Sequence, residues 1–463
     1  MGAPLLTVYI TNYNYGRYIK QAVESVLNQS FQDFELLIID DGSTDDSRTI
    51  IESYANHPQI KIIYQQNQGL NITNNIALRL AVGKYIMRLD ADDYLAPEAL
   101  ESMIQVLEAD STLGLVFPDY YLVDQNNNIT AEIRRHDFGE EVTLLDQPAH
   151  GACTMIRVEN LKAVGGYDEQ YSCQDGYELW IKFIANFKVN NIRKALFYYR
   201  QHGENLTSNE NRILDTRRSI KDNFISKNAI PLSDTLAIVP VRNTKLRGSA
   251  LAFTEIGGKT ILDIKLEALL ESKLLKKIVV TSSEALVKQH LQDHYADEHR
   301  VLFIDRPDEF ARFNVSLNDT IHHILGHASL AYMRRHAFMI LPIEYPFLNG
   351  AVVDDAINTM AIFKADAVIS VRIERSTFYQ HDGSGMTPIL SQDQFTKLER
   401  EALYKGVGGI TLNKVDSFVA SNRILSGKVS HIVVDQKTAH GIFSGFDLEV
   451  AQLLAQKATS PIR

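Results

Sequence analysis

Apolar segments of strand length alternate with amphipathic segments of helix length through the first part of the chain. The strand-like segments are LLTVYIT (5–11), FELLIIDD (34–41), IKIIYQQ (60–66) and KYIMRLD (84–90). Between them lie segments with apolar residues at helical spacing, such as GRYIKQAVESVLNQ (16–29). This alternation predicts βαβ units and a parallel sheet. Ligands of such sheets bind beyond the carboxyl ends of the strands.

Carboxylates accumulate where two of these strands end. DDGSTDD (40–46) follows the second strand, and DADD (90–93) ends the fourth. Such like charges repel one another unless a cation lies among them. Mg²⁺ and Mn²⁺ take one or two carboxylates together with substrate phosphates. The stretch 90–93 also fits a solvated turn with an N-capping aspartate ahead of a helix at Pro97, so by itself it leaves both interpretations open.

Length and composition restrict the class of protein. The 463 residues predict two or three domains, and 45% apolar with 22% charged residues is typical of a soluble globular protein. We expect no membrane span and no signal peptide, because the sequence has neither a long apolar run nor a basic N-terminal region. Cys153 and Cys173 make no disulfide framework and no zinc site, so we expect a reduced, cytoplasmic protein.

Acidic residues dominate the first half of the chain. Residues 1–230 hold 21 Lys and Arg against 31 Asp and Glu, whereas the remainder holds 26 of each kind. Nucleic acid is not an expected partner, because a phosphate-backbone binder needs a basic face. If the first half handles an anionic substrate, a metal ion is the expected counter-charge.

The alternation of strands and helices begins again in the second half. Residues 206–233 are polar, close with Pro231, and predict a helix and a linker. From residue 234 the strand-like segments are TLAIVPV, LKKIVVTSS, RVLFID, AFMILPI and DAVISVRI, with helical segments between them. The sequence therefore predicts an α/β fold of two Rossmann-like, doubly wound domains at 1–205 and 234–463.

Five separated blocks in the first half resemble the family-2 inverting glycosyltransferases, which have the GT-A fold. The blocks are VYITNYNYG with LLIIDDGSTDDS, NQGLNITNNIALRLAVGKYIMRLDADD, VGGYDE, CQDGYELWIKF and YYRQHGENLT. They cover about residues 1–210. The resemblance implies Mn²⁺- or Mg²⁺-dependent, hexosyl-type transfer from a nucleoside-diphosphate sugar, by default a UDP-sugar. The implied acceptor is a hydroxyl of a bacterial surface glycan such as lipopolysaccharide or capsule.

The same resemblance implies roles for the residues that match its blocks. Asp92 and His202 would bind the metal that bridges the diphosphate, and Asp175 would be the general base for the acceptor hydroxyl. One carboxylate on the opposite face of the sugar permits a single displacement with inversion. The residues implied to contact the nucleotide sugar are Thr11, Tyr13, Asp41, Asn74, Asp90 and Arg200. The family often has an arginine in place of Asn74, and Arg88 or Arg200 could replace it at the diphosphate.

The second half resembles the cytidylyltransferases that activate acidic sugars, of the CMP-sialic-acid synthetase type. The matching stretches are LAIVPVRNTKLRGSALAFTEIGGKTILDI, IDRPDEFARFNVSLNDTIHHIL, FMILPIEYPFLNGAVVDDAI and ADAVISVRI. That family has a glycine-rich triphosphate loop, which is here VRNTKLRGSA, leaving Arg242 and Lys245 as candidate ligands. An Asp-x-Asp pair near the C-terminus is reduced to Asp447.

These losses predict a degenerate second domain used for binding, assembly or positioning. Two alternatives remain open: an enzyme that also makes a CMP-activated acidic sugar, and a non-catalytic assembly protein. The resemblance further implies a homodimer formed through the second domain. A glycan or lipid-linked glycan acceptor would then be reached from the cytoplasm, at the inner face of the membrane.

Overall fold

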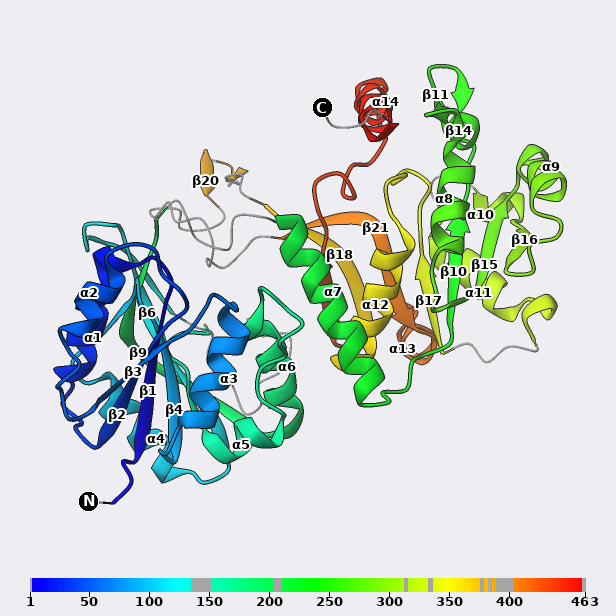
Figure 1. The fold of residues 1–463 in the computed structure, drawn as a ribbon. Coiled ribbons are helices and arrows are strands. Elements are labelled where there is room, and N and C mark those ends of the chain that lie inside the picture. The colour runs from blue at the N-terminus through cyan, green and yellow to red at the C-terminus, as the bar shows by residue number, and fades with distance from the viewer. Residues whose placement is uncertain are drawn as a thin grey trace. The chain divides into compact units, whose positions relative to one another are not determined.

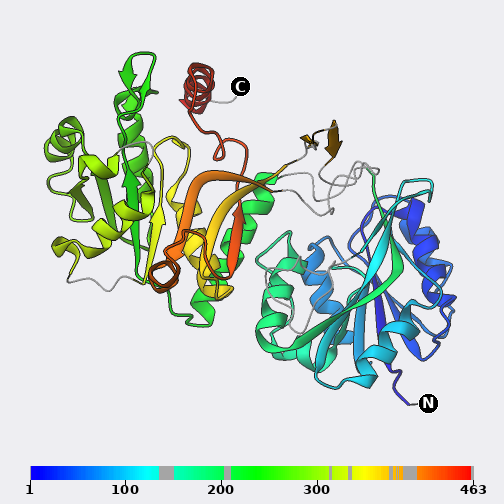
Figure 2. The same ribbon diagram turned by 180° about the vertical axis from the view of Figure 1, so that it is seen from behind.

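The computed structural model describes residues 2–134, 151–202, 210–311, 315–331, 336–374, 379–381, 383, 385–388 and 404–459. The chain divides into two compact units, one of residues 1–217 with 377–401 and one of residues 218–376 with 402–463. Each unit has its own sheet with helices packed against it (Figures 1 and 2). No helix in the described part of the chain is long and apolar enough to cross a bilayer.

The first unit is built on a nine-stranded mixed sheet in the order β3-β2-β1-β4-β8-β6-β9-β5, with β7 paired to β6. Its parallel half consists of β1 (Leu6–Asn12), β2 (Phe34–Asp40), β3 (Ile60–Tyr64) and β4 (Tyr85–Asp90). The other half consists of β5 (Tyr94–Leu95), β6 (Leu113–Val123), β7 (Ile129–Ile133), β8 (Met155–Arg157) and β9 (Lys188–Arg200).

Helices cover both faces of this sheet because alternate residues of the buried strands point to opposite sides. On β1, Leu6, Val8 and Ile10 pack with α1, α2 and α4, whereas Tyr9 packs with α3, α5 and α6. The helices are α1 (Gly16–Leu27), α2 (Ser47–Glu52), α3 (Leu70–Leu80), α4 (Ala99–Ala109), α5 (Val158–Ala163) and α6 (Asp175–Asn186). The predicted α/β fold with a Rossmann-like sheet is confirmed.

The second unit has a seven-stranded sheet in the order β16-β15-β10-β17-β21-β18-β22, in which β21 runs antiparallel to its neighbours. The strands are β10 (Thr235–Pro240), β15 (Leu275–Ser282), β16 (Val301–Asp305), β17 (Ala337–Ile340), β18 (Ala367–Ile373), β21 (Tyr404–Lys414) and β22 (Val429–Val433). Short hairpins join β11 (Lys245–Leu246) to β12 (Ser249–Ala250), and β13 (Glu255–Ile256) to β14 (Lys259–Thr260). A third pairs β19 (Tyr379–His381) with β20 (Met386–Pro388) in the segment assigned to the first unit.

The helix α7 (Glu210–Lys227) spans the boundary between the two units and occupies most of the segment in which a helix and linker are expected. The helices of the second unit are α8 (Ile261–Leu270), α9 (Ala285–His294), α10 (Asp308–Ala311), α11 (Leu317–Gly326), α12 (Gly350–Ile362), α13 (Val415–Ser421) and α14 (Gly445–Thr459).

A lysine lies inside the second unit. Lys265 of α8 is 0% exposed, and its ammonium donates to the carbonyl oxygen of Tyr345 at 2.7 Å. Burial lowers the pKa of Lys265 from 10.5 to about 7, against the attraction of Glu344. The unfolded chain therefore binds one proton more than the folded chain between about pH 7 and pH 10, so the free energy of unfolding rises with pH through that window.

We expect Lys265→Met to stabilise the second unit by about 2 kcal/mol at pH 7, because the cost of burying an ammonium exceeds the lost hydrogen bond. The gain over the unsubstituted protein should shrink toward zero near pH 10. Thermal unfolding of both proteins at several pH values measures it. A gain of equal size at every pH would contradict the conclusion that burial lowers the pKa of Lys265.

Candidate active site

The site is assembled at the carboxyl ends of β1, β2 and β4. The strand register places Asn12 beside Asp40, and Thr11 beside Asp90. Asp40 accepts hydrogen bonds from Asn12 Nδ2 at 2.7 Å and from Ser43 Oγ at 2.5 Å. Asp40 therefore fastens the ends of β1 and β2 together and has a structural role.

Asp41 organises the loop that leads into α3. Its Oδ1 accepts from Gln65 Nε2 at 2.7 Å and from the backbone amide of Gln68 at 2.8 Å. Its Oδ2 accepts from the amide of Gly69 at 2.9 Å. A carboxylate oxygen accepts about two hydrogen bonds, so Oδ2 keeps capacity for a further donor such as a base N–H.

Thr11, Tyr13 and Asp90 lie along the edge between β1 and β4. The Thr11 hydroxyl donates to Asp90 Oδ1 at 3.2 Å. Tyr13, two residues beyond Thr11, is 46% exposed and offers a ring face to solvent. The edge thus combines an exposed aromatic ring with hydroxyl and carboxylate groups, which suits a nucleoside.

Asp92 and His202 come together although 110 positions separate them in the sequence. His202 Nε2 lies 2.9 Å from Asp92 Oδ2, and both side chains are largely buried. The His202 ring stacks on Tyr18 with ring centroids 5.8 Å apart. The structure therefore brings together the two residues that the family resemblance implies as metal ligands.

These two residues fit a shared divalent-ion site. No group of three or more His, Cys, Asp and Glu side chains is arranged to hold a metal among the described residues. A carboxylate and an imidazole can nevertheless supply part of a coordination sphere whose remaining positions belong to substrate phosphates and water, as is usual for Mg²⁺. Burial raises the pKa of Asp93 well above its ordinary value, and the negative charges of Asp92 and Asp90 raise it further. A cation placed among these carboxylates would offset their repulsion.

Arg200 lies behind the acidic turn. Its backbone amide donates to Asp93 Oδ1 at 2.9 Å, and its Nε donates to the carbonyl oxygen of Asp92 at 2.8 Å. Its Nη2 donates to Gln21 Oε1 at 2.9 Å, and the side chain is fully buried. These contacts make Arg200 a support of the acidic turn, and its expected contact with the nucleotide sugar stays a prediction.

Asn74 also lies inside the protein. It is 0% exposed, and its Oδ1 accepts the Tyr9 hydroxyl at 3.1 Å. The Tyr9 hydroxyl in turn lies 3.4 Å from that of Tyr167. The Asn74 side chain is therefore enclosed beneath the site, and its expected contact with the nucleotide sugar stays a prediction.

Asp175 is the first residue of α6, and Arg88 holds it. Arg88 Nη1 pairs with Asp175 Oδ2, while Arg88 Nε lies 2.9 Å from Asp90 Oδ1. Gln174, which precedes the helix, has the left-handed φ of 63° and accepts a hydrogen bond from Arg217. The predicted base and the donor-side carboxylate therefore share one arginine. Sequence reasoning missed this pairing, because Arg88 and Asp175 are 87 positions apart.

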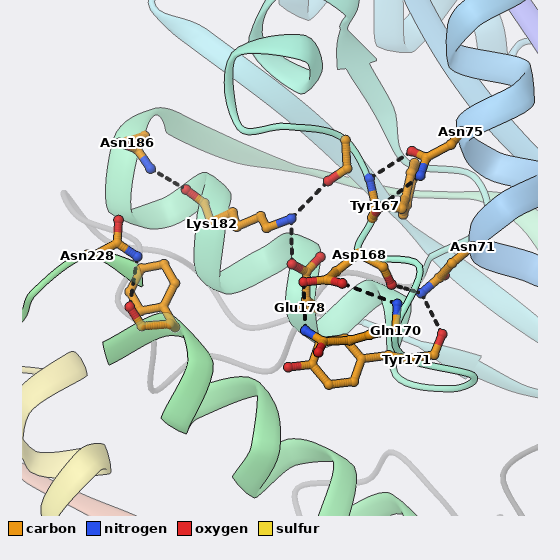
Figure 3. A network of polar contacts seen from close by, with 12 residues as sticks. Asn71, Asn75, Tyr167, Asp168, Gln170, Tyr171, Glu178, Lys182, Asn186 and Asn228 are labelled. Atoms are coloured by element: carbon orange, nitrogen blue, oxygen red, sulfur yellow. Dashed lines mark hydrogen bonds and ion pairs between the residues drawn. The ribbon is translucent and has the colours of Figure 1, made fainter. Parts of the chain in front are cut away.

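Side chains of α3 fix the loop that leads to Asp175 (Figure 3). Asn71 Nδ2 donates to the carbonyl oxygens of Asp168 at 2.8 Å and Tyr171 at 2.9 Å. Asn75 exchanges two hydrogen bonds with the backbone of Tyr167, at 2.8 Å and 3.0 Å. The position of α6 relative to the sheet edge thus depends on α3.

The second unit brings two arginines together at the carboxyl ends of its own parallel strands. Arg242 follows β10, and Arg306 follows β16 on the far side of β15. Arg306 is 2% exposed, and its Nε and Nη1 have no hydrogen-bond partner among the described residues. Burial lowers the pKa of Arg306 to about 10, and the nearby charge of Arg242 contributes. Lys245, the other expected ligand, lies exposed in β11.

Comparison with known proteins bears on the first unit. The sequence profile of Glycosyl transferase family 2 matches residues 7–165. An uncharacterized glycosyltransferase of Methanocaldococcus jannaschii is 32% identical over 216 residues, which are 43% of this chain and 72% of that protein. The chain belongs to glycosyl transferase family 2. The predicted N-terminal resemblance is thereby confirmed, whereas the cytidylyltransferase-like second half stays a prediction.

Other relatives of this family 2 member are longer proteins. Chondroitin synthase of Escherichia coli is 34% identical over 203 residues, and the match covers 44% of this chain and 30% of that synthase. The chain thus spans less than a third of the synthase. Among solved structures, S. aureus TarS 1-349 in complex with UDP-GlcNAc is 22% identical with a TM-score of 0.42, covering 48% of this chain and 66% of that one.

We expect Asn71→Ala to lower turnover by about tenfold or more, because two buried carbonyl oxygens lose their donor and the loop before Asp175 loosens. Asn186→Ala is the matched control. The Asn186 amide only donates to the carbonyl oxygen of Lys182 one turn earlier on α6. Steady-state kinetics of both variants, with thermal unfolding beside them, tests the difference. Equal turnover in the two variants would contradict the bracing role.

Proposed function

We propose that the first unit transfers a sugar from a nucleoside-diphosphate sugar to a hydroxyl group of a growing glycan, with inversion at the anomeric carbon. UDP is the nucleotide we expect. The observation that carries the proposal is the Arg88 bridge, which joins Asp90 at the end of β4 to Asp175 at the start of α6. A donor and an acceptor placed against this sheet edge would each meet one carboxylate.

The donor nucleotide would lie across the ends of β1 and β2. Tyr13 would cover the base, Asp41 would accept a base N–H through Oδ2, and Thr11 with Asp90 would contact the ribose. Asp92 and His202 would hold a divalent ion, Mn²⁺ or Mg²⁺, against the diphosphate. When bound, that ion supplies positive charge for the leaving diphosphate. The support of Arg200 beneath Asp92 and Asp93 would keep the turn fixed while charge develops.

Asp175 would accept the proton of the attacking hydroxyl. A hydroxyl is a poor nucleophile at neutral pH, so a positioned carboxylate must remove its proton as the new bond forms. The oxygen forms the new glycosidic bond, the bond to the diphosphate breaks, and the proton goes to Asp175. Asp175 Oδ2 is engaged by Arg88, which leaves Oδ1 for the hydroxyl.

The chemistry gives no single acceptor. We propose a bacterial surface glycan such as lipopolysaccharide or capsule, free or lipid-linked, reached at the inner face of the membrane. The homodimer through the second unit is part of the same proposal. These statements follow from the family resemblance, and the site contributes only the requirement for a hydroxyl beside Asp175.

We expect Asp92→Ala and Asp175→Asn each to lower transfer or hydrolysis of a UDP-sugar by about 10²-fold or more. They should differ in binding: Asp92→Ala loses Mn²⁺-dependent affinity for UDP, whereas Asp175→Asn keeps it. Calorimetry with UDP and Mn²⁺, beside turnover of a panel of UDP-, GDP- and dTDP-sugars, separates the two. The control is Asp110→Asn, because among the described residues the Asp110 carboxylate accepts hydrogen bonds from Thr112 alone, in its own turn. Full activity of Asp92→Ala with the metal chelated would contradict the assignment of Asp92 as a metal ligand.

We further propose that the second unit binds a phosphate-bearing ligand, with a nucleoside triphosphate as the first candidate. Arg306 is enclosed, its Nε and Nη1 have no hydrogen-bond partner in the part of the chain that the structure describes, and Arg242 adds positive charge beside it. An anion between the two side chains would satisfy those donors and neutralise the repulsion. The loop after β10 lacks the glycines that allow a backbone to wrap a triphosphate, so binding without turnover is the expected behaviour.

We expect CTP or inorganic pyrophosphate to bind the full chain, and Arg306→Gln to weaken that binding by about tenfold or more, since a charge-assisted contact is lost. Calorimetry in the absence of sugar measures it. Arg247→Gln is the control, because Arg247 is exposed and pairs with Glu449. Unchanged affinity in Arg306→Gln would refute the site. Release of pyrophosphate from CTP with an acidic sugar would instead establish the synthetase alternative.

A further inference from the structure

Arg88 stands between the two carboxylates of the first unit that face the reaction. It lies on β4, two residues before Asp90, and is 5% exposed. Its guanidinium lies 2.9 Å from Asp90 through Nε and pairs with Asp175 through Nη1. A buried arginine that contacts two carboxylates from different elements fixes the position of both.

The backbone of residue 151 closes over this arrangement. A Cβ atom at Gly151 would lie 2.5 Å from Arg88 Nη2 and 3.2 Å from Asp175 Oδ2. Real Cβ atoms do not approach other atoms so closely, so a larger residue at this position would require the guanidinium to shift. Two residues further on, the amide of Cys153 donates to the carbonyl oxygen of Arg88 at 2.8 Å, so the same stretch of chain also packs against the Arg88 backbone.

Ionisable groups from several elements surround the ion pair. Burial alone would lower the pKa of Arg88, but the neighbouring acids raise it well above its ordinary value. The guanidinium is therefore a permanent charge. The groups that act on Arg88 or Asp90 here are Tyr9 on β1, Asp90 on β4, Asp92 after it, Tyr167 in the loop before α6, and Asp175 itself. Arg217 approaches from α7 through Gln174.

We propose that Arg88 is a positioning residue that holds Asp175 through Oδ2 and leaves its Oδ1 directed toward the acceptor hydroxyl. The inference rests on the proposed function, because it takes Asp175 as the proton acceptor. Asp90 and Asp175 repel each other, and Arg88 offsets that repulsion from a fixed place. Arg88 thereby couples the donor side of the site to the acceptor side without touching the reacting atoms.

Removing the guanidinium has a consequence that simple destabilisation would not have. Without it, Asp175 loses the contact that fixes its Oδ2, whereas Asp41 keeps its own hydrogen bonds and Asp90 keeps the one from Thr11. A displaced carboxylate is a poor acceptor for the proton of a hydroxyl, because proton transfer needs close and aligned geometry. Turnover should therefore fall while the affinity for UDP changes little.

The test compares Arg88→Lys and Arg88→Gln with a matched buried arginine, Arg157. Arg157 has the same exposure of 5% and donates to Leu113, Leu107 and Tyr85, away from the acidic edge. Steady-state kinetics use the UDP-sugar that the panel above shows to be turned over fastest. Binding of UDP with Mn²⁺ is measured by calorimetry on the same full-length proteins.

We expect Arg88→Gln to lower kcat by about 10²-fold, with UDP affinity changed by less than about threefold. Arg88→Lys should recover part of that loss, because an ammonium group can still pair with Asp175. Arg157→Gln should lower the melting temperature without a comparable fall in kcat.

Gly151→Ala provides a second test if Arg88→Gln does not fold. The added methyl group would displace the guanidinium while every charge remains, so kcat should fall by about tenfold or more with little change in UDP affinity.

Three results would overturn the inference. The first is full turnover in Arg88→Gln, and the second is a loss of UDP affinity as large as its loss of turnover. The third, full turnover in Gly151→Ala, would show that the close packing of the pair is dispensable. Full activity of Asp175→Asn, or no turnover of any sugar nucleotide by the unsubstituted protein, would instead overturn the proposed function and this inference with it. An inactive Asp175→Asn beside a fully active Arg88→Gln would reject the positioning role alone.

Discussion

The repulsion among carboxylates at one sheet edge is the constraint on which the first unit depends. Asp90 ends β4, and Asp92 and Asp93 follow in the next turn, so the three carboxylates lie close together and are largely withdrawn from water. Burial and mutual repulsion raise the pKa of Asp90 and Asp93. Arg88 beside Asp90 and Arg200 beneath the turn supply part of the compensating positive charge. A divalent ion would supply more, and its charge would in turn attract a diphosphate.

Rigidity of the surrounding loops is the second feature of the site. Asp41 uses three hydrogen bonds to shape the loop before α3, and α3 in turn holds the loop before α6 through Asn71 and Asn75. The residues expected at the nucleotide and the residue expected at the acceptor are thus connected through one helix. A substrate-positioning site needs this kind of support, because small displacements of a catalytic group cost large factors in rate.

The two units treat an anionic ligand in opposite ways. In the first, the carboxyl ends of the parallel strands carry acids, so a phosphate would need a cation between it and the protein. In the second, the corresponding ends of β10 and β16 carry Arg242 and Arg306, so a phosphate could be bound directly. Similar sheets therefore present opposite charge at the same kind of edge. We expect the two units to differ in their need for a metal.

The sequence by itself determined the α/β class, the parallel strands and the acids at their ends, because strand and helix periodicity and turn chemistry are local properties. It also determined the family, since the motif blocks are read in order along the chain. Only the tertiary structure decided that Arg88 bridges Asp90 and Asp175, that Asn74 and Arg200 lie inside, and that Arg306 is enclosed beside Arg242. Those facts depend on burial and on contacts between residues tens of positions or more apart, which neither residue type nor spacing encodes.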